Sequence, residues 1–453
     1  MSSSLDVIFK AYDIRGVYPD ELDEDVARSV GNAFVAFTGA DRVAVGRDMR
    51  PSSEPLAAAF IDGATLAGAD VVDLGLTSTD LCWFASGHLD SPAAMFTASH
   101  NPSEYGGIKL SRAGAAPVGV ETGLAQIKGA VESGLLERAG DRGQVERRDL
   151  LPEFAAHVRT FVDVDDLRPL RVVADTANGM GGLVVPAIFD GLPFELTILY
   201  PELDGTFPNH PADPIQAENL EDLQKAIVEA DADVGLAFDG DADRVFLVDD
   251  RAEVLSGSLT TAIVAKGILE HNPPSKDGGE TIVHNLICSK AVPEIIREAG
   301  GTPVRTRVGH SFIKQVMAET GAIFGGEHSG HYYFRDNYRA DSGLIAALLV
   351  LEQLSRTDQP LSELRRPFER YAGSGEINTR VDDPPAVIER VAAAYEDAEQ
   401  DRLDGLTVDF GDWWFNLRPS NTEPLLRLNL EAADAAACEE HTAEVLALVR
   451  GEK

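Results

Sequence analysis

The chain has 453 residues, 44% of them hydrophobic, which is more than one hydrophobic core usually organises, so we expect several domains. Its 75 acidic residues outnumber its 39 basic ones, and the formal net charge of −36 is spread along the chain, which argues against nucleic acid as a partner. The longest aliphatic run, Leu344 to Leu351, is too short to cross a bilayer, and the N-terminal segment lacks the features of a signal peptide. We therefore expect a cytoplasmic protein that does not enter membranes.

The charged residues also carry information about the solvent. Most basic residues are arginine, and the large acidic excess predicts a strongly hydrated surface. Such a surface is typical of proteins that work in concentrated salt, where repulsion between like charges is screened. The composition therefore predicts a halophilic protein, with an ordinary acidic protein as the alternative. The sequence is compatible with a monomer or a homodimer.

Short apolar strands alternate with amphipathic helices through most of the chain. The first unit predicts a strand at 42–48 followed by a helix, and the same texture recurs after residues 171 and 281. Three α/β units are expected on this pattern. Residues 67–75 resemble residues 299–309, but the similarity is too short to establish a repeat.

The last part of the chain has a different pattern. From Glu376 it predicts a strand, a helix, three further strands and a final helix that ends at Arg450. The predicted fold is therefore α/β, with three similar mixed α/β domains and a smaller C-terminal α+β domain. We expect these domains to span residues 1–150, 151–255, 256–370 and 371–453.

Three aspartates at alternate positions form the motif DGDADR at 239–244, between two apolar strands. Carboxylates at this spacing can converge on one hard cation, and ligands that are all oxygen favour Mg²⁺ or Ca²⁺ over zinc. An EF-hand is excluded because Arg244 stands where that loop needs glycine and because strands flank the motif. The two interpretations left are a metal site made by Asp239, Asp241 and Asp243, and a solvated acidic turn.

A serine beside a histidine forms the second motif, TASHNP at 97–102. Neighbouring residues in a strand point to opposite faces, and no GxSxG motif encloses Ser99, so a hydrolase triad is poorly supported. A phosphate carried on Ser99 fits better, because a nearby metal would neutralise its charge and Gly106 and Gly107 would let the backbone approach it. The alternative is a turn capped by serine and asparagine.

Two further motifs could contact a phosphorylated sugar. The segment RPSNTEP at 418–424 combines an arginine fork with neutral donors, as a phosphate cradle does, although a hydrogen-bonded hairpin turn has the same composition. In GGEHSGH at 325–331, strand alternation would place Glu327 and Ser329 on one face, where they can bind sugar hydroxyls, and His328 on the other. A loop of small residues is the alternative there.

In this order the four motifs resemble the α-D-phosphohexomutase superfamily, most closely its phosphomannomutase/phosphoglucomutase branch, across essentially the whole chain. FKAYDIRG around Arg15 and GRDMRPSS around Arg47 and Arg50 extend the resemblance. It implies four domains around a central cleft and a magnesium enzyme that interconverts the 1- and 6-phosphates of mannose, glucose or both. It further implies a phosphoserine, a hexose 1,6-bisphosphate that serves as intermediate and primer, and hexose phosphates as the substrates.

The resemblance also implies roles for single residues. The catalytic roles fall on Ser99 as the phosphoserine, His100, Arg15 and the general-base candidate Lys109. The metal ligands are Ser99, Asp239, Asp241 and Asp243. The substrate contacts are Arg244, His310, Glu327, Ser329, His331, Arg418, Ser420, Asn421 and Thr422.

This chain departs from the family pattern at two places. His328 stands where dual-specificity mutases usually carry methionine, and the strand near 282–289 lacks a lysine that some relatives place there, with Lys290 too far along to replace it. A phosphoglucosamine mutase is the nearest alternative, though that branch resembles GEQSGH and has glycine in place of Asn421. A metal-dependent sugar phosphatase and an inactive sugar-phosphate-binding paralogue are alternatives from other classes.

Overall fold

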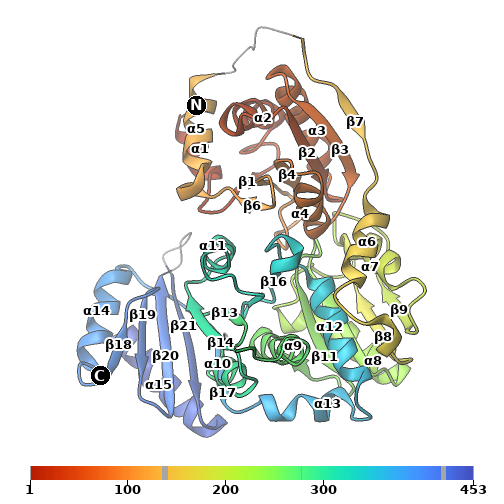
Figure 1. Ribbon diagram of the computed structural model, residues 1–453. Helices are drawn as coiled ribbons and strands as arrows, with labels where there is room; N and C mark the ends of the chain where they lie inside the picture. The colour runs from red at the N-terminus through yellow and green to blue at the C-terminus, as the bar shows by residue number, and fades with distance from the viewer. Residues whose placement is uncertain (1, 135–140, 277, 420–424, 452–453) are drawn as a thin grey trace.

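Four β-sheets, each built from a different stretch of the chain, organise the computed structural model of this protein (Figure 1). The structure describes residues 2–134, 141–276, 278–419 and 425–451. Figure 1 shows the first unit at the top, the second at the right, the third in the centre and the fourth at the lower left. Within the described ranges, no helix is both long enough and apolar enough to cross a membrane.

The first unit is a mixed sheet with helices on both faces. Its strands follow the order β1-β5-β4-β2-β3-β7, with the short β6 paired to β5. They are β1 (Ile14–Val17), β2 (Arg42–Arg47), β3 (Asp70–Leu76), β4 (Ala93–Phe96), β5 (Tyr105–Arg112), β6 (Ala116–Pro117) and β7 (Val145–Arg147). The helices are α1 (Ser2–Ile8), α2 (Glu24–Thr38), α3 (Ser53–Leu66), α4 (Thr79–His88) and α5 (Leu124–Ser133).

Strand alternation divides this sheet between two cores. Val43 and Val45 of β2 pack with α2 and α3, whereas Ala44 between them joins the core that continues into the second and third units. The first unit is therefore held to the others by buried apolar surface on the face that α4 covers, and not by a flexible linker alone.

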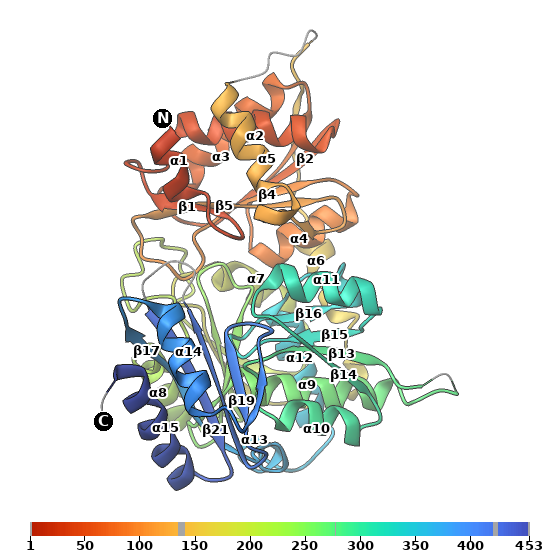
Figure 2. The same ribbon diagram turned by 90° about the vertical axis from the view of Figure 1, so that its left-hand side faces the viewer.

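The second and third units have smaller sheets. The second contains β8 (Arg171–Asp175), β9 (Glu195–Leu199), β10 (Val234–Phe238), β11 (Val245–Asp249), β12 (Val254–Leu255), α6 (Leu151–Arg159), α7 (Gly181–Phe189) and α8 (Glu221–Ala230). The third contains β13 (Thr281–Asn285), β14 (Thr302–Thr306), β15 (Phe324–Gly326), β16 (Tyr332–Phe334), α9 (Gly257–His271), α10 (Ala291–Glu298), α11 (His310–Thr320), α12 (Gly343–Ser355) and α13 (Leu361–Leu364). Figure 2 shows α11 on the side of the third unit that faces the first.

The fourth unit is an antiparallel sheet in the order β17-β21-β20-β19-β18, covered by two helices. Its elements are β17 (Ala372–Arg380), β18 (Glu399–Asp401), β19 (Leu406–Asp409), β20 (Trp413–Pro419), β21 (Leu425–Ala432), α14 (Pro384–Ala394) and α15 (Ala435–Arg450). Five 3₁₀ helices also lie in the described ranges: Val120–Thr122, Val164–Asp166, Ala217–Leu220, Arg335–Asn337 and Arg366–Phe368. The fold class predicted from the sequence is confirmed, whereas the exact domain boundaries stay a prediction.

The first three units share one topology. Each contains four consecutive strands, beginning at β2, β8 and β13, in one arrangement: the first of the four lies between the second and the third and is parallel to both, and the fourth runs antiparallel to the third. The matching orders are β3-β2-β4-β5, β9-β8-β10-β11 and β14-β13-β15-β16. The two short similar segments of the sequence, 67–75 and 299–309, contain most of β3 and all of β14, which occupy the same position in these sets of four strands.

This shared topology determines where three of the motifs lie. The turn from third to fourth strand is the serine loop (97–104) in the first unit, the aspartate loop (239–244) in the second and the histidine loop (327–331) in the third. Each loop follows the carboxyl end of a parallel strand, where α/β sheets usually place their ligands. The motifs therefore occupy equivalent positions in three similar units.

The N-terminus of α4 joins three units at a buried point. The Thr79 hydroxyl donates to Oδ2 of Asp241 at 2.5 Å, and its backbone N–H donates to the carbonyl oxygen of Asp241 at 3.0 Å. The next residue, Asp80, accepts from the Ser342 hydroxyl of the third unit at 2.8 Å. Burial raises the pKa of Asp80 to about 8. These contacts fix the first unit against the aspartate loop.

Gly343, the first residue of α12, touches the aspartate loop closely enough to provide a test of this packing. A Cβ atom at Gly343 would lie 2.7 Å from the carbonyl carbon of Arg244. Because the atom it meets belongs to the backbone, the clash can be relieved only if α12 or the aspartate loop shifts. We expect Gly343→Ala to lower the free energy of unfolding by about 1–3 kcal/mol, the usual cost of overpacking. Chemical denaturation of the full chain measures it.

Gly129 in α5 provides the matched control, because a Cβ atom there meets open space. Gly129→Ala should be neutral or stabilise by up to about 1 kcal/mol through helix propensity. Equal unfolding curves for the two variants would contradict the close docking of α12 on the aspartate loop.

Candidate active site

Ser99 lies in the serine loop in a backbone conformation that non-glycine residues rarely adopt. Its φ is 52°, and its side chain is buried. The backbone N–H of Ser99 donates to the Thr97 hydroxyl at 2.9 Å, which closes a short turn. Gly240 of the aspartate loop lies so close that a Cβ there would meet the Ser99 carbonyl oxygen at 2.4 Å. Strain of this kind persists only where the surroundings hold it, and it concentrates at functional sites.

Arg50 holds the serine loop from within the protein. Its guanidinium donates to the carbonyl oxygens of Ser99 (2.8 Å), Asn101 (2.6 Å) and Pro102 (2.7 Å). The side chain is fully buried, with the carboxylate of Asp48 at 3.3 Å from Nε. A buried guanidinium is costly unless its donors are satisfied, so these carbonyls and Arg50 fix one another. The sequence marked Arg50 only as part of a motif and did not reveal this contact.

Arg15 reaches the same loop from β1. Its guanidinium donates to the side-chain oxygen of Asn101 at 2.5 Å and to Asp13 at 2.5 Å. The register places Arg15 opposite Gly107 of β5. The structure therefore brings Arg15 to the serine loop, beside the segment that carries Ser99.

The aspartate loop meets Ser99 directly. The Ser99 hydroxyl donates to Oδ2 of Asp239 at 2.8 Å, and Arg244 donates to the same oxygen at 2.8 Å. Carboxylate oxygens of Asp239, Asp241 and Asp243 lie within 4.8 Å of one another, and all three side chains are buried. Ser99 and the three aspartates, which come from two units, thus form one site.

Lys109 of β5 supplies positive charge to this site. Its Nζ lies 2.7 Å from Asp241 and 2.8 Å from Asp243. Burial alone would lower the pKa of Lys109, but the two carboxylates outweigh it and raise that pKa above its usual value. Lys109 therefore carries its proton in this arrangement. A general-base role, which needs the neutral amine, stays a prediction.

The donor set of the aspartate loop fits a hard divalent cation. Oδ1 of Asp241 and Oδ1 of Asp243 are buried and have no hydrogen-bond partner among the described residues. Burial, strengthened by the charges of Asp241 and Asp243 and opposed by Arg244, raises the pKa of Asp239 to about 7. Unpaired carboxylate oxygens and a raised pKa both indicate too little positive charge for three buried carboxylates. An oxygen-binding cation such as Mg²⁺ would supply it.

His100 points its Nδ1 at Arg244. The distance from Nδ1 to Nη2 of Arg244 is 2.6 Å, and the Ser99 hydroxyl lies 3.3 Å from the same nitrogen. Because a guanidinium only donates, Nδ1 accepts and the ring proton lies on Nε2. The charge of Arg244, together with burial, lowers the pKa of His100 well below its usual value. His100 is therefore a neutral ring whose Nδ1 is already engaged.

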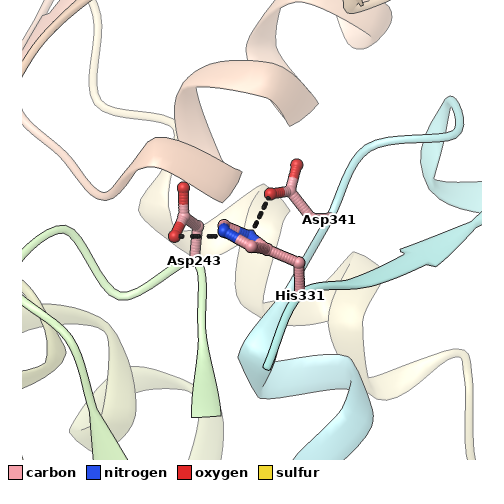
Figure 3. Close-up of side chains that lie close together, drawn as sticks. All are labelled: Asp243, His331 and Asp341. Carbon is pink, nitrogen blue, oxygen red and sulfur yellow. Dashed lines mark hydrogen bonds and ion pairs between the residues drawn. The ribbon is translucent and has the colours of Figure 1, made fainter. Parts of the chain in front are cut away.

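His331 lies between two carboxylates (Figure 3). Its Nδ1 is 2.9 Å from Asp341 and 3.9 Å from Asp243. Burial would lower the pKa of His331, but Asp243 and the hydrogen bond to Asp341 raise it. A bridge between the backbones of Arg244 and His331 joins the aspartate and histidine loops. No sequence pattern singled out Asp341. It reaches His331 because the chain turns back after β16 and pairs Asp341 with Tyr333 of that strand.

The histidine loop is a turn, so the alternation expected from a strand is wrong there. Its ends are closed by hydrogen bonds from the Gly330 N–H to the Glu327 carbonyl (3.2 Å) and from the Glu327 N–H to the His331 carbonyl (3.0 Å). Period-two alternation holds only in extended backbone. His328 and Ser329 both line the central cleft, and we correct the expectation that His328 points away from it.

Glu327 and His310 lie behind the histidine loop. Glu327 is 2% exposed, and its carboxylate accepts from the Tyr333 hydroxyl at 2.9 Å and from the Gly309 N–H at 3.0 Å. His310 begins α11, and its ring lies 5.2 Å from that of Tyr12 in an edge-to-face arrangement. Burial lowers the pKa of His310 to about 3, so its ring is neutral.

The fourth unit presents two arginines to the cleft, both bound by one carboxylate. Glu376 of β17 lies 2.8 Å from Arg418 and 3.2 Å from Arg427. The Nε atoms of both arginines are buried without a hydrogen-bond partner in the described part of the chain. Both arginines line the cleft, so their guanidinium groups can bind a further anion there. Of the predicted phosphate-binding residues, Ser420, Asn421 and Thr422 lie outside the described residues.

A cleft with a volume of about 1690 Å³ is lined by all four units, and His328, Ser329, Arg418 and Arg427 lie on its wall, whereas Ser99 and the three aspartates are not among its lining residues. Residues that represent the units in order are Tyr12, Ile215, Ser329 and Arg418. The central cleft expected from the resemblance is thus confirmed. It is wide enough for a sugar phosphate, since ligand pockets commonly measure about 300–1,000 Å³.

Family models match consecutive parts of the chain. They are phosphoglucomutase/phosphomannomutase alpha/beta/alpha domain I at residues 6–137, domain II at 152–253, domain III at 256–371 and the C-terminal domain at 376–448. All four domain models of one family therefore match in order.

Whole-chain relatives agree with these models. The chain is 40% identical to the phosphohexose mutases protein of Xanthomonas campestris pv. campestris (strain B100), over 98% of this chain and 99% of the relative. It is 40% identical to a phosphomannomutase of Salmonella montevideo, over 97% and 98%. A solved phosphoglucomutase/phosphomannomutase family protein from Burkholderia thailandensis superposes with a TM-score of 0.87 at 32% identity, covering 98% of each chain.

The unpaired oxygens of the aspartate loop lead to a direct test of metal binding. We expect Asp241→Asn to weaken Mg²⁺ binding about tenfold or more, because a neutral amide replaces one of three anionic ligands. Isothermal titration calorimetry on the full chain measures the affinity. Asp358→Asn, which changes an exposed carboxylate away from the cleft, is the control with matching chemistry and should bind normally. Equal affinities for both variants would reject the site.

Proposed function

The chain belongs to the phosphoglucomutase/phosphomannomutase family, and from that premise we propose that it interconverts hexose 1-phosphates and hexose 6-phosphates by way of a phosphate carried on Ser99. One observation carries the proposal. The Ser99 hydroxyl, held in a strained turn, lies 2.8 Å from a carboxylate of a buried aspartate cluster whose remaining oxygens lack partners. A phosphoserine beside a divalent cation is what such a site can hold.

Asp239, Asp241 and Asp243 would hold Mg²⁺, which when bound neutralises charge on the phosphate of Ser99 and so favours its transfer. The chain's own cations act in the same direction. Lys109 and Arg244 already lie within hydrogen-bond distance of these carboxylates, and both can donate to phosphate oxygens. Arg50 keeps the serine loop in place while the group moves.

The first transfer exchanges one P–O bond for another. A hydroxyl of a hexose phosphate attacks the phosphorus on Ser99, the bond to the Ser99 oxygen breaks, and a hexose 1,6-bisphosphate forms. The hydroxyl proton must pass to a base, and the Ser99 oxygen must regain a proton. His331 in its neutral form is a further candidate for the base, because its hydrogen bond to Asp341 occupies Nδ1 and leaves Nε2, although the neighbouring carboxylates raise its pKa and so favour the protonated ring. His100 has its Nδ1 engaged by Arg244, and Lys109 is charged.

The second transfer needs the bisphosphate to present its other end. Arg418 and Arg427, with the neighbouring residues Ser420, Asn421 and Thr422, would hold whichever phosphate is not reacting. The guanidinium groups of Arg418 and Arg427 would then exchange the Glu376 carboxylate for the arriving dianion. The Ser99 oxygen then attacks the phosphorus at that other end, the bond from this phosphorus to the sugar oxygen breaks, and the isomeric hexose phosphate is released. Molecules of this enzyme that lack the phosphate on Ser99 would obtain it from a hexose 1,6-bisphosphate, which therefore acts as the primer.

The finer properties belong to the same proposal. Hexose phosphates are the substrates, and their dianions need the cationic groups that this acidic chain retains in its cleft. A cytoplasmic location and adaptation to concentrated salt agree with the net charge of −36. A phosphatase built on the same aspartates would release inorganic phosphate and need no primer, and an inactive paralogue would bind without turnover. A coupled mutase assay with a phosphate assay beside it separates these possibilities.

The phosphoserine assignment can be tested by mass. We expect active enzyme to carry one phosphate on Ser99 and Ser99→Ala to lose nearly all turnover, because the Ser99 hydroxyl is the nucleophilic oxygen that lies beside the buried aspartate cluster. Intact-mass measurement with peptide mapping locates the phosphate. Ser133→Ala, an exposed serine of α5, should retain both phosphate and activity. A phosphate mapped elsewhere, or normal turnover without Ser99, rejects the assignment.

Substrate choice within the family is the other direct measurement. We expect glucose 1-phosphate and mannose 1-phosphate to be converted with kcat/KM values within about tenfold of each other, because the two sugars differ only at the 2-hydroxyl. Glucosamine 1-phosphate, the substrate of the nearest alternative enzyme, should be slower than both. The assay uses saturating bisphosphate and constant salt. A preference beyond about a hundredfold contradicts dual specificity.

A further inference from the structure

A second cavity, which we call the joint cavity, lies where the second and third units meet. Its volume is about 1020 Å³, and its wall is formed by α6 and the segment after it, by the C-terminal ends of α9 and α12, and by residues in or beside β15 and β16. α12 runs between α6 and α9 and touches both (Figure 1). Within the described ranges, no residue lines both this cavity and the central cleft, so the two are separate.

Glu352 of α12 is a buried acid on the wall of the joint cavity. Its side chain is 0% exposed, and its Oε1 accepts from the backbone N–H of Asp163 at 3.0 Å and from Arg356 at 3.2 Å. Oε2 is buried and has no hydrogen-bond partner in the described part of the chain. Nε2 of His271 lies 3.6 Å from it, which is too far for a hydrogen bond. A buried carboxylate oxygen without a donor is costly, so this position lacks a positive group.

His271 marks the way from the cavity to that oxygen. Its side chain is 34% exposed and lines the same cavity, whereas Oε2 of Glu352 is closed off from solvent. An exposed side chain at the end of a helix changes rotamer at little cost. A ligand that reaches Oε2 therefore takes the position beside it that the imidazole now holds.

The charges around the joint cavity select a cation. α6, α9 and α12 all end beside the cavity, and the carbonyl ends of helices carry partial negative charge. The two arginines of the wall are already engaged. Arg159 donates to backbone carbonyls at the end of α7, and Arg356 donates to Glu352 and Asp166. An anion would therefore meet an unpaired carboxylate, whereas a cation would meet its complement.

The rest of the wall favours an organic cation over a metal ion. A divalent metal needs several ligands, and the groups of three acidic or histidine ligands that the described residues form both include Asp243 of the aspartate loop. The wall of the joint cavity instead carries aliphatic side chains and the rings of Phe161 and Phe334, whose centroids are 5.6 Å apart. Such a surface buries a hydrocarbon body, and aromatic faces also attract ammonium groups.

We propose that the joint cavity binds a small organic ammonium ion, whose nitrogen donates to Oε2 of Glu352 in place of the His271 imidazole and whose hydrocarbon part packs against the phenylalanine rings. Glu352 also binds the backbone of Asp163, so the ligand strengthens the joint between the second and third units. α12 begins at Gly343 against the aspartate loop, which places the two sites at opposite ends of one helix. The inference concerns a different cavity and does not depend on the mutase function.

Isothermal titration calorimetry of the full-length protein with benzylammonium tests the proposal. Mg²⁺ is present throughout, so that the aspartate loop does not attract the probe. Benzyl alcohol and benzoate are titrated in parallel, because they keep the ring and lack the positive charge.

Three variants locate the probe. Glu352→Gln keeps the volume of the side chain and removes its charge. Glu270→Gln is the matched control, because Glu270 is an exposed glutamate of α9 outside the cavity wall. Ala156→Trp fills part of the cavity from an exposed position of α6 and leaves Glu352 unchanged.

We expect benzylammonium to bind one to one and at least about tenfold more tightly than benzyl alcohol or benzoate, because a hydrogen bond to a buried charge changes affinity by about tenfold or more. Glu352→Gln and Ala156→Trp should each weaken binding by about tenfold or more, and Glu270→Gln should leave it unchanged. Thermal unfolding checks that each variant is folded, and Ala156→Trp decides if Glu352→Gln is not.

Three results would overturn the inference: absence of saturable benzylammonium binding, equal affinity for the charged and uncharged probes, or unchanged affinity in folded Ala156→Trp, which would place the probe elsewhere on the protein. None of these measurements uses turnover. A failure of the mutase function therefore leaves the outcome for the joint cavity unaffected, and the reverse also holds.

Discussion

The burial of three carboxylates around one serine is the constraint on which the site depends. Asp239, Asp241 and Asp243 are removed from water at the end of one strand, and carboxylates so placed need nearby positive charge. Part of that charge comes from Arg244 on the same loop, but Lys109 comes from β5 of the first unit. The site therefore exists only when the first two units are docked, and the interface is part of the chemistry.

The docking itself uses short-range backbone contacts. Thr79 bonds to both the side chain and the backbone of Asp241, and Arg50 binds the carbonyls that surround Ser99. At Gly240 and Gly343 no Cβ fits, because the backbone of a neighbouring loop already lies there. Such contacts leave little freedom for the serine and aspartate loops to separate. Any large movement in the reaction therefore falls to the fourth unit, whose two cleft arginines form their ion pairs with Glu376 of the same unit.

The kind of charge differs between the serine and aspartate loops and the fourth unit, in a way that matches a hexose with phosphates at both ends. The serine and aspartate loops provide a cation site beside a nucleophilic oxygen, and the fourth unit provides two arginines. Between them the histidine loop offers uncharged donors from His328 and Ser329. A dianion is stabilised by charge, and a sugar ring is recognised by neutral hydrogen bonds. The serine, aspartate and histidine loops come from one repeated topology, which explains how equivalent turns came to contact one another.

Local pattern in the sequence was sufficient for the fold class, for four of the five strands of the fourth unit (the short β18 was missed), and for recognising the motifs around Ser99 and Asp239. Strand and helix periodicity depend on neighbouring residues, and the aspartate motif acts through residues that are close in the chain. The strand alternation expected at His328 was wrong, because the loop closes into a turn. Backbone hydrogen bonds between Glu327 and Gly330 and between Glu327 and His331 hold that turn.

The partners that make the site work lie far apart in sequence, and only the tertiary structure could identify them. Asp341 orients His331, Asn285 sets the tautomer of His328, and Glu376 bridges Arg418 and Arg427. Nothing in the local pattern marks these residues, because their roles arise from strands that turn back or from units that dock. The sequence by itself determined which groups could do chemistry. Packing decided which of them meet, which carry a proton and which face the substrate.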